Sequence, residues 1–246
     1  MTPKAPRARI LMLGGAGETA AALAAVRGRA GLEVRVLCDG ATPRGVVSDL
    51  QDVTPDRAGL TQALRAGGFT HLLDVTHGFA GQISTDAAAA CKATGAQYAL
   101  LHRPAWTPAP GDRWTEVPDV AAASDSIAPF ERVFTNVGRA LLPALAGFGG
   151  QLFVRQTTRH TMPPPQGNIR YVFGSPPFSH DAEVALLRDL AVDAVLFRNT
   201  GGAASETKVT AARALGLQMV MLSRPVAPEG THLPDVAAVA RWADSL

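Results

Sequence analysis

The chain has 246 residues, enough for one large domain or two domains of about 120 residues each. Its 47% hydrophobic and 18% charged residues exclude a disordered chain, and its net charge of +2, with no block of like charges, gives no support for a nucleic-acid partner. Two cysteines cannot form a disulfide framework and no apolar run reaches the length of a membrane span, so we expect a cytoplasmic protein without a membrane partner.

Short apolar runs alternate with alanine-rich helical stretches through the first half of the chain. The predicted strands are 8–13, 33–39, 71–76 and 97–103. The predicted helices are one with Ala22, Leu23 and Val26 on a single face, one around 56–66 and one around 82–94. The region 105–131, punctuated by prolines and a glycine, is the expected domain boundary, and Trp114 to Val117 within it can form a short strand of either domain.

The same rhythm returns in the second half. The predicted strands are 132–137, 152–158, 169–174, 194–200 and 219–224, and the predicted helices lie around 139–147, 180–191, 204–215 and 234–245. Apolar strands without polar alternation, separated by helices, indicate parallel sheets covered on both faces. The sequence therefore predicts an α/β fold of two Rossmann-like, doubly wound parallel-sheet domains, 1–112 and 113–246.

The two halves also share a pattern. Residues 89–104 and 211–225 each carry the end of an alanine-rich helix, a glycine placed to end that helix, an apolar strand and an Arg-Pro pair. Each segment follows a strand that ends in a polar, glycine-containing loop. This pattern predicts one strand–helix–strand unit used twice, with chance similarity between alanine-rich units as the alternative.

A glycine-rich loop follows the first predicted strand. Gly14-Gly15-Ala16-Gly17 lets the backbone approach a ligand closely, and the free amides of a helix N-terminus favour a phosphate or a carboxylate. The loop lacks the third glycine of the dinucleotide-binding fingerprint, and a tight turn without a ligand is the alternative. Asp39, at the end of the second strand, is placed to bind a ribose.

The second half has a less obvious counterpart, Thr135-Asn136-Val137-Gly138-Arg139. The next strand carries Arg155 and Arg159 at its carboxyl end, where nucleotide-binding folds meet the adenosine ribose. An arginine there suits a 2′-phosphate and so indicates NADP rather than NAD. Surface charges or substrate ligands are the alternatives for both arginines.

Two further strand-end loops, Thr76 to Ala80 and Asn199 to Gly202, offer hydroxyls, amides and backbone N–H groups to a phosphate, a ribose or a carboxamide. Lys208 follows in the next helix and can pair with an anion, or be a solvated helix lysine. His77 is the histidine best placed for chemistry. The other histidines, at 71, 102, 160, 180 and 232, show no ligand spacing, so we expect no metal.

Several motifs then combine in a fixed order. They are LGG (13–15) followed by Glu18, DVTHGFAGQIS (74–84), HRPAW (102–106), VFTNVGR (133–139), FRNTGGAASETK (197–208) and VMLSRP (220–225). Together they resemble the precorrin-6A reductase family of cobalamin biosynthesis, over nearly the whole chain. One departure is Gly78, where the family usually has a proline, and glycine loosens that loop.

The resemblance implies a two-domain Rossmann-like oxidoreductase that uses NADPH to reduce precorrin-6A to precorrin-6B by direct hydride transfer. The substrate would be a flat tetrapyrrole-derived ring edged with carboxylates, lying in a cleft that the two domains share. The planar guanidinium group matches a carboxylate, so the arginines expected at the ring's edge are Arg103, Arg139, Arg159, Arg198 and Arg224. The resemblance also allows a transient hand-over to other enzymes of the pathway.

The motifs assign residues to each ligand. The expected cofactor-binding residues, in the second domain, are Thr135, Gly138, Arg139, Arg155, Asn199, Thr200, Gly201, Gly202 and Lys208. The expected substrate-binding residues, in the first domain, are Gly14, Gly15, Thr19, Thr76, His77, Phe79, Gln82, Ser84 and Arg103. His77 is the candidate catalytic acid if the ring nitrogens do not hold the proton themselves. The reverse assignment of the two ligands to the domains stays open.

Two other functions remain as alternatives. One is a different NAD(P)-dependent oxidoreductase or a methyltransferase, although neither Tyr98 nor Tyr171 has the lysine four residues on that short-chain dehydrogenases use. The other is a two-lobed binding protein that closes over an anionic ligand, because the fold alone does not fix the function.

Overall fold

The computed structural model describes residues 6–38, 45–50 and 52–246. Asp39, the residue expected to bind a ribose, lies outside the described residues. None of the helices in these ranges combines the length and the apolar character that crossing a lipid bilayer requires.

The chain forms two compact units. The first is Met1–Pro104 with Pro225–Leu246, and the second is Ala105–Arg224. The predicted boundary between residues 112 and 113 is therefore moved to residues 104 and 105. The second predicted domain also loses its last segment, 225–246, to the first unit. The C-terminal segment returns to the first unit because β11 (Thr231–Leu233) pairs with β4 (Gln97–Leu101), and because Val239 of α7 (Val236–Ser245) packs in the same core as Ala22 of α1 (Thr19–Val26).

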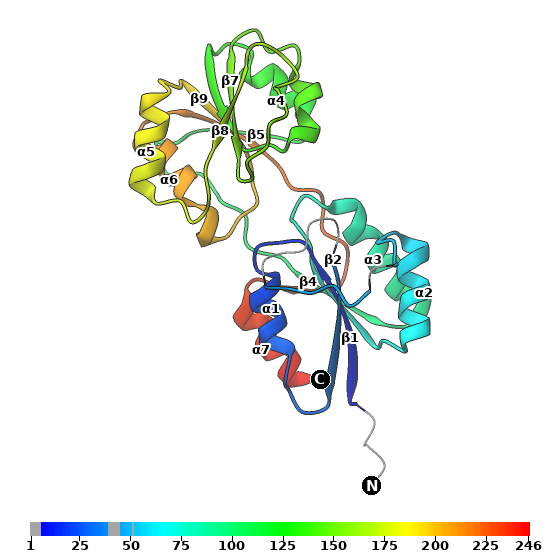
Figure 1. Cartoon of the computed structure of the whole chain (residues 1–246). Coiled ribbons are helices and arrows are strands. Elements are labelled where there is room, and N and C mark those ends of the chain that lie inside the picture. The colour runs from blue at the N-terminus through cyan, green and yellow to red at the C-terminus, as the bar shows by residue number, and fades with distance from the viewer. Residues whose placement is uncertain (1–5, 39–44, 51) are drawn as a thin grey trace. The chain divides into compact units, whose positions relative to one another are not determined.

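The first unit contains a parallel sheet of five strands in the order β11-β4-β3-β1-β2. The strands not yet given are β1 (Ala8–Gly14), β2 (Leu32–Cys38) and β3 (His71–Val75). Helices α1 and α7 cover one face, and α2 (Arg57–Gly67) and α3 (Gly81–Thr94) cover the other (Figure 1). Along β1, Ile10 and Met12 enter one core while Leu11 and Leu13 enter the other, which is why its sequence does not alternate.

The second unit contains a parallel sheet of six strands in the order β5-β10-β9-β6-β7-β8. The strands are β5 (Arg113–Val117), β6 (Arg132–Thr135), β7 (Gln151–Gln156), β8 (Ile169–Phe173), β9 (Ala194–Arg198) and β10 (Gln218–Leu222). The helical segments are α4 (Val120–Ile127), η1 (Arg139–Leu145), α5 (His180–Asp189), η2 (Ala203–Ser205) and α6 (Thr207–Ala214). Helix α5 packs beside α6, as Figure 1 shows. Both predicted parallel α/β sheets are thus confirmed.

Two details differ from the prediction, and a third settles an alternative that the sequence left open. The helix expected at 139–147 is the 3₁₀ segment η1, which contains Pro143, a residue without the N–H group that a regular helix needs. Helix α4 lies inside the expected boundary region and was not predicted. The short strand expected within 114–117 belongs to the second unit, since β5 pairs with β10 as an edge strand.

The predicted repeat has a structural counterpart. The β3–α3–β4 and β9–α6–β10 units hold equivalent places in their sheets, and the glycines that follow α3 and α6, Gly95 and Gly216, have φ of 81° and 63°. In each sheet the chain reverses its winding direction between two neighbouring strands, β1 and β3 in the first unit and β6 and β9 in the second. Ligands of doubly wound sheets bind outside the carboxyl ends of strands at such points.

Candidate functional site

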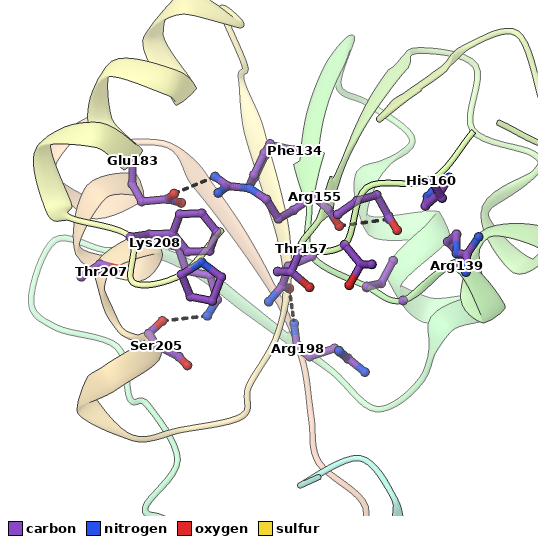
Figure 2. A pocket seen from close by; sticks show the side chains of 17 residues that line it. Phe134, Arg139, Arg155, Thr157, His160, Glu183, Arg198, Ser205, Thr207 and Lys208 are labelled. Atoms are coloured by element: carbon purple, nitrogen blue, oxygen red, sulfur yellow. Dashed lines mark hydrogen bonds and ion pairs between the residues drawn. The ribbon is translucent and has the colours of Figure 1, made fainter. Parts of the chain in front are cut away.

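A cavity of 520 Å³ lies at the carboxyl edge of the second sheet (Figure 2). Its walls come from the segment after β6 (136–139), the end of β7 and the residues that follow it (155–158 and His160), Arg198 at the end of β9, and Ser205, Thr207 and Lys208. These are the strand ends on either side of the winding reversal between β6 and β9. The position is therefore the one at which this class of fold binds nucleotides.

Positive charge predominates in the lining of this cavity. Arg139, Arg155, Arg198 and Lys208 contribute cations, and Glu183 contributes a carboxylate. Burial lowers the pKa of the Arg198 guanidinium, but an arginine begins so far above neutral pH that it stays charged. Such a surplus of positive charge in a concave site favours a ligand that carries several negative charges.

Arg155 is held from several sides. Its Nη2 donates to Oε1 of Glu183 over 2.6 Å, and the two side chains are 9% and 5% exposed. Its guanidinium carbon also lies 4.1 Å from the ring centre of Phe178 and 5.3 Å from that of Phe134. Figure 2 shows the ion pair at one wall of the cavity. The ion pair with Glu183 and the two neighbouring rings hold the planar guanidinium group of Arg155 in one position in that wall.

The predicted cofactor residues divide into two groups. Gly138, Arg139, Arg155 and Lys208 line the cavity. The others, Thr135, Asn199, Thr200, Gly201 and Gly202, are not part of its lining.

Thr135 and Asn199 instead hold the loops in place. The hydroxyl of Thr135 donates to the carbonyl of Leu196 over 2.6 Å and accepts from the backbone N–H of Val137, so it ties β6 to β9. The side-chain amide of Asn199 is bonded to the backbone of Trp106. Both residues are fully or almost fully buried, which makes them supports of the site.

Sequence reasoning missed several lining residues. Thr157 and His160 follow β7, so the strand-end rule that selected Arg155 also covers them. Both ring nitrogens of His160 are buried without a hydrogen-bond partner among the described residues, and the ring stands edge-on to Tyr171. Glu183 comes from the first turn of α5, where an acidic residue is common, so the sequence carries no signal for it.

In the first unit, the glycine-rich loop is closed on itself. The hydroxyl of Thr19 accepts from the backbone N–H of Gly15 over 3.1 Å and donates to the carbonyl of Ala16 over 2.7 Å. The N–H of Ala16 donates to the carbonyl of Val75 over 3.0 Å. Since the amides of Gly15 and Ala16 already have partners, this part of the loop has the character of a tight strand-to-helix turn.

The first testable prediction concerns this turn. A Cβ added at Gly14 would lie 2.6 Å from Cγ2 of Thr19, whereas one added at Gly17 meets no described atom within 4 Å. Gly14→Ala is therefore expected to displace Thr19 and to lower the free energy of unfolding by about 1–3 kcal/mol. Gly17→Ala is the matched control, with an expected change of about 0.5 kcal/mol or less. Urea denaturation measures both, and equal midpoints would contradict the packing argument.

A buried carboxylate organises the second loop of this unit. Asp74, at the end of β3, is fully buried, and its Oδ1 accepts from the backbone N–H of Thr76 (2.9 Å) and from its hydroxyl (2.7 Å). Its Oδ2 accepts from the Tyr98 hydroxyl over 2.7 Å. Burial, with the nearby Asp74 charge, raises the pKa of Tyr98, which therefore stays a phenol and a donor. The hydroxyls of Thr76 and Ser84 lie 3.4 Å apart in the same buried group.

His77 follows this network. Its Nδ1 accepts from the backbone N–H of Phe79 over 3.2 Å, so the neutral ring carries its proton on Nε2. His77 and Phe79 are half-buried, with ring centres 6.1 Å apart, and Gln82 is exposed. Arg103 is paired with Glu18 across the carboxyl edge of the first sheet.

The predicted substrate residues thus divide by burial. Thr19, Thr76 and Ser84 are buried supports of the loops. Gly15 lies at the meeting point of those loops, because a Cβ there would be 3.5 Å from Cα of Thr76. His77, Phe79, Gln82 and Arg103 keep part of their surface at the edge of the sheet. Asp74, Tyr98 and Glu18 are the supporting residues that sequence reasoning missed.

Comparisons with known proteins agree with one another. The family model described as "Precorrin-6x reductase CbiJ/CobK" matches residues 9–244. Precorrin-6A reductase of Rhodococcus erythropolis is 34% identical over 97% of this chain and 98% of its own length. The enzyme of that name from Rhodobacter capsulatus is 34% identical over 95% of both chains. A solved structure of "CobK precorrin-6A reductase" covers 97% of both chains at 33% identity, with a TM-score of 0.85.

Proposed function

The chain belongs to the precorrin-6x reductase family of cobalamin biosynthesis, and on that premise we propose that it reduces precorrin-6A to precorrin-6B with NADPH as the reductant. The observation that carries the choice of coenzyme is the cavity of the second unit, where three arginines and a lysine meet at the winding reversal of the sheet. NADPH, with a pyrophosphate and a 2′-phosphate, has the charge that this lining suits. The cytoplasm stays the predicted compartment.

Within that cavity we assign roles by position. Gly138 and Arg139, at the start of η1, occupy the place at which these folds bind a pyrophosphate, and Lys208 adds a cation from α6. Arg155, at the end of β7, occupies the place of the adenosine ribose and is proposed for the 2′-phosphate. Thr135 and residues 199–202 do not line the cavity; their proposed role is to hold the loops that carry these groups.

The first unit is proposed to bind the ring. In its glycine-rich loop the amides of Gly15 and Ala16 already have partners within the fold, and this supports the assignment of the coenzyme to the second unit. His77, Phe79 and Gln82 offer an imidazole, an aromatic face and an amide at the sheet edge. Arg103 is the guanidinium proposed for a peripheral carboxylate, in exchange for its bond to Glu18.

The reaction adds a hydride, which carries two electrons and one hydrogen, and one separate proton to the ring. NADPH, when bound, would supply the electron pair as a hydride from its nicotinamide and would become NADP⁺. The role proposed for the chain is to hold the two reactants in a fixed orientation. If a side chain delivers the proton, Nε2 of His77 is the donor, because the Phe79 N–H fixes the tautomer that carries its proton there.

Anaerobic incubation of the protein with precorrin-6A and NADPH deuterated on either face of nicotinamide C4 tests this proposal. The expected result is a change in ring absorbance matched to the loss of NADPH fluorescence, with deuterium from one face retained in the product. A ring that stays unchanged, or label that is lost to solvent, would contradict direct hydride transfer. NADH at the same concentration serves as the control for coenzyme choice.

A further inference from the structure

We propose that Trp106 is a positioning residue for the coenzyme, which holds Lys208 and the turn at residues 199–202 in place without lining the cavity itself. The inference rests on the proposed NADPH site. Trp106 is buried at 7% exposure and is the second residue of the second unit; the sequence placed it in the HRPAW motif and in the boundary region without giving it a role.

The backbone of Trp106 is fixed by one side chain. Oδ1 of Asn199 accepts from the Trp106 N–H, and Nδ2 of Asn199 donates to the Trp106 carbonyl, both over 2.9 Å. Asn199 is 2% exposed, so water does not compete for this pair of bonds. The pair joins the entry of the chain into the second unit to the loop that follows β9.

The indole of Trp106 then holds that loop at a second point. Its Nε1 donates to the carbonyl of Gly202 over 3.1 Å. Gly201 and Gly202 have φ of 67° and 81°, two consecutive residues in a conformation that other residues rarely adopt. Glycines have the largest freedom to leave this conformation, so a bond from outside the turn helps to keep it. The turn leads directly into η2 and α6, which carry Lys208.

The face of the same indole holds the lysine. Nζ of Lys208 lies 4.4 Å from the Trp106 ring centre and donates to the carbonyl of Ser205 over 2.7 Å. The negative face of an indole ring attracts an ammonium group, most strongly away from bulk water. Lys208 lines the cavity and Trp106 does not, so the tryptophan acts on a bound anion through the lysine.

The test is a double-mutant cycle on NADPH affinity. Trp106→Phe keeps the backbone bonds to Asn199 and removes the bond to Gly202. It also weakens the attraction between the aromatic ring and the Lys208 ammonium group. Trp106→Tyr is a second variant, with the same six-membered ring and an added hydroxyl, in case the first folds poorly. Lys208→Met removes the ammonium. Trp114→Phe is the matched control, because the Trp114 Nε1 has no hydrogen-bond partner among the described residues.

We expect Trp106→Phe to raise the Kd of NADPH about tenfold, with kcat and the KM for precorrin-6A unchanged, and Trp114→Phe to leave the Kd as it is. In the Lys208→Met background, adding Trp106→Phe is expected to raise the Kd of NADPH by about twofold or less. An unchanged Kd in Trp106→Phe, or the same tenfold loss in the Lys208→Met background, would overturn the inference alone. Failure of the unchanged protein to bind NADPH would overturn the proposed function, and the inference with it.

Discussion

Arg155→Ala is expected to remove the preference for NADPH over NADH and to destabilise the second unit. The variant leaves the carboxylate of Glu183 buried without its partner, which costs about 3–5 kcal/mol of unfolding free energy. Loss of a charge-assisted bond to the 2′-phosphate raises the Kd of NADPH about 10- to 100-fold and leaves that of NADH nearly unchanged. Urea denaturation and coenzyme titration measure the two effects separately.

A neutral pair separates stability from recognition. Arg155→Met combined with Glu183→Gln leaves no buried charge, so it is expected to recover most of the lost stability. The same double variant has no cation for the 2′-phosphate, so the preference for NADPH stays lost. If the double variant still prefers NADPH, or if Arg155→Ala weakens NADPH and NADH equally, Arg155 has no role at the 2′-phosphate.

Asp74→Ala is the second large expected effect. It leaves the N–H and hydroxyl of Thr76 and the hydroxyl of Tyr98 buried without their acceptor, at about 1–3 kcal/mol for each group. We expect a total loss of about 3–5 kcal/mol in unfolding free energy. Turnover is expected to fall as well, because Thr76 adjoins His77 in the loop proposed for the ring. Denaturation and steady-state kinetics are the measurements.

Milder changes at the same place serve as controls. Asp74→Asn keeps an oxygen for Thr76 and places an amide that can donate to the Tyr98 oxygen, so its cost is expected to be about 1 kcal/mol. Asp86→Asn, on the outer part of α3, is expected to change stability by about 0.5 kcal/mol or less. An Asp74→Ala variant as stable as the Asp86 control would show that the network does not organise the loop.

The layered fold was predictable because strands buried on both faces carry an unmistakable composition. β1 and β9 are almost continuously apolar, and the glycines after α3 and α6 end those helices. The return of residues 225–246 to the first unit was not predictable. The three-residue strand β11 carries too little pattern, and α7 can cover either sheet as far as its sequence shows.

The site was predictable only to the level of loops. The rule that ligands meet strand ends selected Gly138, Arg139, Arg155 and Lys208, which line the cavity. The same rule selected Thr135 and Asn199, whose polar side-chain atoms are hydrogen-bonded to the backbone of Leu196 and Trp106 and do not line the cavity. Side-chain partners such as Glu183, 28 residues from Arg155, depend on tertiary packing that no local pattern records.

Glycine content was a poor guide to the nature of a loop. The glycine-rich stretch at residues 14–17 closes on itself through Thr19, while the cavity adjoins a loop with one glycine, Gly138. Whether a backbone amide can bind an anion depends on its existing bonds. Here the amide of Gly15 is bonded to the hydroxyl of Thr19, four residues further along the chain. The sequence shows the glycines but not this competition.

Amide hydrogen exchange of the whole protein, with and without NADP⁺, most directly tests the claim that the second unit binds the coenzyme. We predict slower exchange at residues 136–139 and 199–208, with exchange at 14–19 and 76–80 unchanged. Slower exchange confined to 14–19 and 76–80 would place the coenzyme in the first unit and contradict the account.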